Sequence, residues 1–119
     1  MTERLICCVY TQPLPGRESE YNDWYDHRHL HDVARVPGVL SAQRFEMLGT
    51  ESAIGGPLTR FMAIYEVEGD PSGFVGELRS RFGTDEMPAS DALDLKSLTM
   101  TFWKARAEPV VSQSPVVSP

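Results

Sequence analysis

Proline and glycine divide this chain into six segments, and the side-chain pattern changes from one segment to the next. The first segment is rich in apolar and β-forming residues and ends at the turn Pro13-Leu14-Pro15-Gly16. The second segment has no proline or glycine and repeats charged residues at helical intervals until Pro37-Gly38. The predicted elements are a strand at 5–10, a helix at 17–35, strands at 39–47 and 59–67, a helix at 70–82 and a strand at 93–104.

The order of these elements, β-α-β-β-α-β, indicates a ferredoxin-like fold of the α+β class. In this arrangement an antiparallel four-stranded sheet carries two helices on one face. The 119 residues suffice for one domain with a hydrophobic core and are too few for two. We therefore predict one domain over residues 1–106. After Arg106 the composition changes to Val, Ser and Pro, so residues 107–119 are predicted to be a disordered tail or an arm that contacts a partner.

The predicted strands carry apolar residues on both of their faces. Successive side chains of a strand point to opposite sides of a sheet. Two helices can cover only one side, which leaves the other side wet unless something packs on it. We therefore expect a homodimer that packs sheet against sheet. In the predicted strand 59–67, Phe61, Ala63 and Tyr65 point to one face, and Met62 and Ile64 point to the other. In the predicted strand 93–104, Leu98, Met100 and Phe102 point to one face, and Leu95 and Trp103 point to the other.

The composition excludes several classes of partner. A net charge of −6 argues against nucleic acid, because phosphate binding requires clustered Lys and Arg. No segment approaches the roughly 18 apolar residues of a membrane span, and no secretory signal is visible, so a cytoplasmic location is expected. Cys7 and Cys8 are adjacent in a predicted strand and point to opposite faces, which indicates reduced packing residues rather than a disulfide.

All three histidines lie between positions 27 and 31 of the first predicted helix. Histidine is the only side chain whose unperturbed pKa lies between pH 5 and 8. On a helical wheel His29 falls within the apolar arc, with Tyr25 four residues and Asp26 three residues before it. Two interpretations fit this placement. His29 is either a general acid or base that Asp26 or Tyr25 orients in a pocket, or a core histidine that bonds Asp26 or a backbone carbonyl.

His27 and His31 fall on the outer side of the same wheel, with Trp24 and Arg28 near one edge. Their spacing is that of a helical metal-ligand pair, but a metal site needs a further ligand, for which Asp23 is the candidate. A solvated helix face explains the pattern more simply. We therefore predict no metal site.

A longer motif surrounds these histidines. It reads Asn22-Asp23-Trp24-Tyr25-Asp26, then His29-Leu30-x-Asp32, Val36-Pro37-Gly38-Val39 and Ala42-x-Arg44-Phe45. This pattern resembles the EthD-like family of the dimeric α/β-barrel superfamily over about residues 20–46. The resemblance implies a ferredoxin-like subunit that dimerises through its sheet into an α/β barrel, and it places the family's histidine at His29. His27 and His31 have no counterparts, and relatives often have proline where this chain has His31.

The resemblance also implies a range of activities, since the superfamily includes cofactor-independent monooxygenases, polyketide cyclases, small lyases and isomerases. Our first hypothesis is an enzyme without metal or organic cofactor that acts on a small hydrophobic metabolite, aromatic or carbonyl-containing, as a lyase, dehydratase, isomerase or cyclase. The alternatives are a cofactor-independent monooxygenase and a non-catalytic binding or accessory protein.

In the first hypothesis His29 transfers a proton and Asp26 orients it, while Tyr25 or Asn22 binds a substrate oxygen. Arg44, on a predicted strand, is a candidate for binding an anionic or carbonyl group. The aromatic candidates for the pocket wall are Tyr21, Trp24, Phe61, Tyr65 and Phe102.

Overall fold

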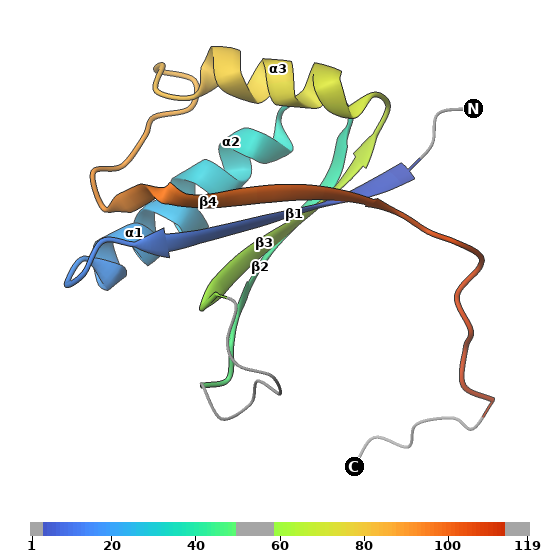
Figure 1. The fold of residues 1–119 in the computed structure, drawn as a ribbon. Coiled ribbons are helices and arrows are strands. Elements are labelled where there is room, and N and C mark those ends of the chain that lie inside the picture. The colour runs from blue at the N-terminus through green and yellow to red at the C-terminus, as the bar shows by residue number, and fades with distance from the viewer. Residues whose placement is uncertain (1–3, 50–58, 114–119) are drawn as a thin grey trace.

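The computed structural model describes residues 4–49 and 59–113, in which a four-stranded sheet carries a layer of helices (Figure 1). All six predicted elements are present, and the predicted ferredoxin-like α+β class is confirmed. The first predicted helix comprises two α-helical parts joined by a π-helical turn. In chain order the elements are β1 (Arg4–Pro13), α1 (Glu18–Trp24), the π-turn η1 (Tyr25–His29), α2 (Leu30–Ala34), β2 (Val39–Glu46), β3 (Phe61–Glu68), α3 (Pro71–Arg81) and β4 (Leu93–Lys104).

The strands follow the order β2-β3-β1-β4, and every neighbouring pair is antiparallel. In the centre of the sheet, Cys7 of β1 lies opposite Tyr65 of β3 on one side and Phe102 of β4 on the other. The first helical segment, formed by α1, η1 and α2, and the second helix, α3, lie over the same face of this sheet (Figure 1). Helices and sheet thus form two layers with the core between them.

The core between the layers follows the predicted strand alternation. In β3, Phe61, Ala63 and Tyr65 are buried beneath the helices, whereas Met62 and Ile64 lie on the other face. On β1, Cys7 is buried and Cys8 is half-buried, and both are free thiols, as predicted. Burial raises the pKa of the Cys7 thiol to about 12, which makes it unreactive.

The far face of the sheet carries no helix of the described part of the chain (Figure 1). Three large apolar side chains are exposed on it: Ile6 is 37%, Phe45 41% and Trp103 58% accessible. The predicted two-sided apolar sheet is therefore present in the structure.

The prediction for Leu95 was wrong. Strict alternation placed Leu95 on the same face of the sheet as Trp103, away from Leu98 and Met100. In the structure Leu95 lines the space beneath the helices together with Leu98 and Met100. The register shows the reason. Tyr10 pairs with Thr99 and Gln12 with Asp94, so β4 has additional residues at this point and alternation is interrupted.

As predicted, Gly38 ends the first helical segment and Asp70-Pro71 begins α3. Gly38 adopts φ +94°, and a Cβ there would lie 2.7 Å from the carbonyl oxygen of Glu68, so the turn into β2 requires glycine. Pro71 occupies the first turn of α3, and the Asp70 side chain caps that helix by accepting from the Ser72 amide.

Two observations concern the predicted tail and the predicted lack of a membrane span. Residues 107–113 have no regular secondary structure, and 114–119 lie outside the described residues, so the tail remains a prediction. None of the helices in the described ranges combines the length and the apolar composition needed to cross a membrane.

Candidate active site

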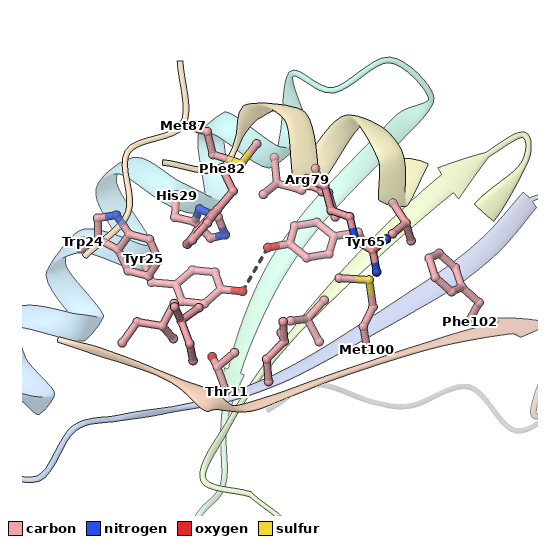
Figure 2. A pocket seen from close by; sticks show the side chains of 17 residues that line it. Thr11, Trp24, Tyr25, His29, Tyr65, Arg79, Phe82, Met87, Met100 and Phe102 are labelled. Atoms are coloured by element: carbon pink, nitrogen blue, oxygen red, sulfur yellow. Dashed lines mark hydrogen bonds between the residues drawn. The ribbon is translucent and has the colours of Figure 1, made fainter. Parts of the chain in front are cut away.

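A cavity of about 490 Å³ lies between the helices and the β1–β4 side of the sheet (Figure 2). Its volume falls within the range of about 300–1,000 Å³ that is typical of small-molecule sites. Aromatic rings, aliphatic side chains and two thioethers form most of its wall. The lining residues are Val9, Thr11, Trp24, Tyr25, His29, Val33, Tyr65, Val75, Leu78, Arg79, Phe82, Met87, Leu93, Leu95, Leu98, Met100 and Phe102.

The π-turn η1 determines how two of these side chains meet. The amide of Leu30 bonds the carbonyl of Tyr25, five residues back, so this turn is wider than an α-helical one. It brings Trp24 and His29, also five residues apart, into a stacked pair with ring centroids 4.6 Å apart and an interplanar angle of 18°. The wheel with α-helical spacing placed Trp24 near one edge, with the outward histidines, and did not predict this stacking on His29, although Trp24 was a candidate for the pocket wall and does line the cavity. The indole of Trp24 is also anchored, because its Nε1 donates to the carbonyl of Pro88 at 2.9 Å.

His29 is enclosed by aromatic rings on the cavity wall. Besides the stacked Trp24, the edges of Tyr25 and Phe82 approach it with centroids at 5.0 and 5.7 Å. Its Nδ1 is buried and has no hydrogen-bond partner among the described residues. An unpartnered buried polar atom typically costs about 1–3 kcal/mol. The interpretation of His29 as a core histidine satisfied by Asp26 or a carbonyl therefore does not hold.

The surroundings of His29 keep its ring neutral. The pKa of His29 is lowered from 6.5 to about 4: burial is the main cause, the buried carboxylate of Asp32 opposes it, and the Arg44 guanidinium adds a smaller lowering. Asp32 is held by Arg28 and Arg35 through hydrogen bonds of 2.7 and 2.9 Å. At neutral pH the ring is thus in its proton-accepting form, and Asp32 stabilises the cation that forms when it accepts a proton.

A pair of tyrosines supplies hydrogen-bond donors to the same cavity. The hydroxyls of Tyr25 and Tyr65 lie 3.2 Å apart, and both residues are buried (Figure 2). Burial raises the pKa of Tyr25 to about 12 and that of Tyr65 well above its usual value of 10. Both phenols therefore keep their protons. One proton serves the bond between them, which leaves the second for an oxygen of a bound molecule.

Arg44 organises the side of this site away from the cavity. Its guanidinium bonds Asp26 at 2.6 Å and Asn22 at 2.9 Å, and it stacks 4.4 Å from the centre of the Tyr25 ring. The expected contact of Asp26 with His29 is not formed, because Asp26 pairs with Arg44. Arg44, Asp26, Asn22, Tyr21 and Phe61 thus form a group behind Tyr25, whereas Trp24, Tyr25, Tyr65 and Phe102 reach the cavity with His29.

Replacement of Arg44 by lysine is expected to destabilise the fold by about 1–2 kcal/mol. A lysine ammonium keeps the charge but cannot stack flat on Tyr25 while bonding Asp26 and Asn22. Urea unfolding followed by tryptophan fluorescence measures the change. Arg60→Lys is the control, because Arg60 is half exposed and its partners Glu18 and Glu46 are also exposed. Equal losses in the two variants would contradict a special role for Arg44.

The sequence did not predict that α3 and the loop after it form one wall of the cavity. Leu78, Arg79, Phe82 and Met87 line the cavity, but nothing in their local pattern separates them from ordinary core or surface residues. The alternation of β4, which placed Met100 and Phe102 on one face, was the one signal that could have located the opposite wall.

The other two histidines lie apart from this cavity, as predicted. His27 is exposed and approaches Asp23 at 3.6 Å, and His31 is also exposed. Among residues 4–49 and 59–113, no group of three or more His, Cys, Asp or Glu side chains is arranged to hold a metal ion.

The fold and the cavity define a ferredoxin-like α+β protein with a pocket of small-molecule size. No family model matches the chain, and no curated protein is significantly similar to it in sequence. A monooxygenase candidate from Shewanella loihica PV-4 shares the fold with a TM-score of 0.59 at 13% identity, over 91% of this chain and 99% of that chain. An EthD family protein from Bacillus halodurans C-125 shares it with a TM-score of 0.56 at 20% identity, over 88% of this chain and 99% of that chain. The second similarity agrees with the EthD-like motif of the sequence.

Proposed function

We propose that this protein is a small-molecule enzyme in which His29 removes a proton from a carbon atom next to a carbonyl group. The observation that carries this proposal is the neutral imidazole of His29 on the wall of an apolar cavity, with a buried Nδ1 that has no hydrogen-bond partner among the described residues. A buried polar atom without a partner destabilises the folded protein, and such atoms are typical of catalytic sites. A proton transfer of this kind begins eliminations, isomerisations and cyclisations, and the reaction would be of one of these types.

The reaction also requires a hydrogen-bond donor for the carbonyl oxygen, and the tyrosine pair supplies it. When the carbon–hydrogen bond breaks, the proton passes to the imidazole of His29 and the electron pair moves to the carbonyl oxygen. The hydroxyl proton left over by the Tyr25–Tyr65 bond can be donated to that oxygen and stabilise the developing enolate. The imidazolium then returns its proton to carbon or to a leaving group.

A base with a pKa of about 4 is weak, but this does not exclude the reaction. In ketosteroid isomerase a carboxylate base with a pKa of about 4.6 removes a proton next to a carbonyl, because donors that include a tyrosine stabilise the enolate. His29 here has a pKa of about 4 and lies beside Tyr25, whose protonated hydroxyl bonds that of the protonated Tyr65. Asp32, rather than the predicted Asp26, compensates the charge on the imidazolium.

Exchange of ketone protons with solvent tests this proposal without knowledge of the natural substrate. The protein is incubated in D₂O with a panel of aromatic ketones, including 2-acetonaphthone and 4-acetylbenzoate, and deuterium incorporation is followed by NMR. We expect exchange above the buffer rate for at least one ketone. Binding of these ketones without any exchange would instead support a non-catalytic binding protein.

Oxygenation without a cofactor is the second candidate function. It is supported by the fold shared with the monooxygenase candidate from Shewanella loihica. The same proton transfer to His29 would produce the substrate anion, which would then react with molecular oxygen. Oxygen consumption during the exchange assay would distinguish this reaction from a lyase, isomerase or cyclase reaction.

We further propose that two copies of the chain pack through the uncovered face of the sheet. This face presents Ile6, Phe45 and Trp103 to solvent in the single chain, next to the partly buried Met62 and Ile64. Contiguous exposed apolar surface of this kind typically marks an interface.

Replacement of Ile64 by lysine is expected to convert a dimer to a monomer, because it places a charge in the centre of the uncovered face. Sedimentation equilibrium or light scattering after gel filtration measures the mass. Leu48→Lys provides the control, since Leu48 is 90% exposed and lies beyond the end of β2. A monomeric wild-type protein would contradict the proposed dimer.

A further inference from the structure

The guanidinium of Arg79 is the unusual group on the cavity wall. Arg79 belongs to the last turn of α3 and is exposed, and its side chain extends from the helix to the wall of the cavity that Tyr65 and Met100 also line (Figure 2). All other lining residues are apolar or uncharged at neutral pH, once His29 is taken as neutral. A single permanent cation therefore lies beside an otherwise apolar space.

Arg79 also differs from the other described arginines between the start of β1 and the end of β4; Arg106, which lies beyond the end of β4 and does not line the cavity, is the other described arginine without an ion pair to a described residue. Arg79 makes no ion pair or hydrogen bond with a described residue, although acidic residues outnumber basic ones, 17 to 11, in the sequence. Its neighbour on the same helix, Arg81, bonds Glu77 at 3.0 Å and approaches Glu86 at 3.7 Å. The arginines that pair with a carboxylate are Arg4, Arg17, Arg28, Arg35, Arg44, Arg60 and Arg81.

We infer that the ligand of this cavity is an aromatic carboxylic acid, whose carboxylate pairs with Arg79 while its apolar body fills the space beside His29. This inference rests on the proposed function, because it names the substrate class of the same site. A guanidinium presents paired N–H donors that match a carboxylate in two parallel hydrogen bonds.

The remainder of the wall indicates an aromatic body for this acid. The rings of Trp24, Tyr25, Tyr65, Phe82 and Phe102 surround the cavity, and the thioethers of Met87 and Met100 complete it. Aromatic edges and faces and methionine sulfur all make favourable contacts with a planar ring. A neutral apolar ligand would leave Arg79 without a role, and a ligand with several charges would leave charges unpaired among these rings.

The net charge of the chain makes the local cation necessary. At a formal charge of −6 the protein repels anions at long range, so an acid binds only where a cation compensates at close range.

Binding of a matched pair of probes tests the inference, using 2-naphthoate and its neutral amide, 2-naphthamide, in isothermal titration calorimetry. We expect the wild-type protein to bind the acid about tenfold more tightly than the amide, which corresponds to about 1.4 kcal/mol. Arg79→Gln should reduce this preference to about twofold or less. Arg81→Gln, the control on the same helix, should keep it, because Arg81 does not line the cavity.

Each result separates this inference from the proposed catalysis. Equal binding of the two probes by the wild-type protein, or an acid preference that survives in Arg79→Gln, would overturn the role of Arg79 and leave the proton transfer by His29 unaffected. A preference that depends on Arg79 in a protein without ketone exchange would support the ligand class and overturn the catalysis. Failure of both probes to bind would overturn the ligand class together with the use of the cavity for molecules of this size.

Discussion

A His29→Gln variant is expected to lose about 10²–10⁴-fold of the ketone exchange that the wild-type protein catalyses, the range typical of a removed general base. Glutamine keeps a polar side chain of similar length but cannot accept and return a proton at neutral pH. The hydroxyls of Tyr25 and Tyr65 remain in this variant, so binding of the ketone should change much less than its rate of exchange. Exchange rates and dissociation constants measured for the same ketone give this comparison.

A Tyr65→Phe variant gives the complementary result. Removal of that hydroxyl leaves Tyr25 without its 3.2 Å partner and weakens stabilisation of the enolate, so exchange should decrease while His29 remains competent. For the His29→Gln variant, His31→Gln is the control, because His31 is exposed on the same helical segment and does not line the cavity. Undiminished exchange in a folded His29→Gln protein would show that another group is the base.

Much of the fold could be predicted because its signals are local. Pro13 and Gly16 end β1, Pro37-Gly38 ends the first helix, and Asp70-Pro71 begins α3, each through a backbone property of that residue type. Alternation in β3 then assigned its two faces. These rules act over a few residues, and no tertiary contact overrides them here.

The π-turn could not be predicted in the same way. It inserts one residue into a helical turn without proline, glycine or any change in hydrophobic pattern, and its bond from Leu30 to Tyr25 is visible only in the structure. The α-helical wheel still placed His29 inward, since Tyr25 and His29 are neighbours in either geometry. It did not predict the stacking of Trp24 on His29, because side chains five residues apart meet only in the wider turn.

The electrostatics of the site depend on contacts between distant segments. Asp26 is three residues from His29, which favours a contact on an ideal helix, but Arg44 from β2 binds its carboxylate instead. The carboxylate that acts on His29 is Asp32, and its burial depends on Arg28 and Arg35. The Asp26–Arg44 pair does not follow from sequence spacing, because Arg44 comes from β2. Asp32 has helical spacing to His29, Arg28 and Arg35, but Asp26 is also three residues from His29, so spacing alone did not show which carboxylate acts on the ring.

The acid sensitivity of the fold provides a test of the His29 environment that requires no ligand. His29 has a pKa of about 4 in the folded protein and about 6.5 when unfolded, so below pH 6.5 the unfolded chain binds a proton that the folded protein rejects. Stability therefore falls as the pH decreases from 6.5 to 4, and this group accounts for about 3 kcal/mol of the loss.

Urea unfolding at pH 7, 6, 5 and 4 compares the wild-type protein with His29→Gln, whose side chain does not titrate. The titrating carboxylates are common to both proteins, so the difference between their losses isolates His29. We expect the wild-type protein to lose about 3 kcal/mol more than the variant over this interval. His27→Gln should lose as much as the wild type, because His27 is exposed near Asp23 and lies away from the cavity. Parallel curves for the wild type and His29→Gln would mean that the ring titrates normally in the folded protein, and that the cavity does not hold it in the neutral form on which the proposed proton transfer depends.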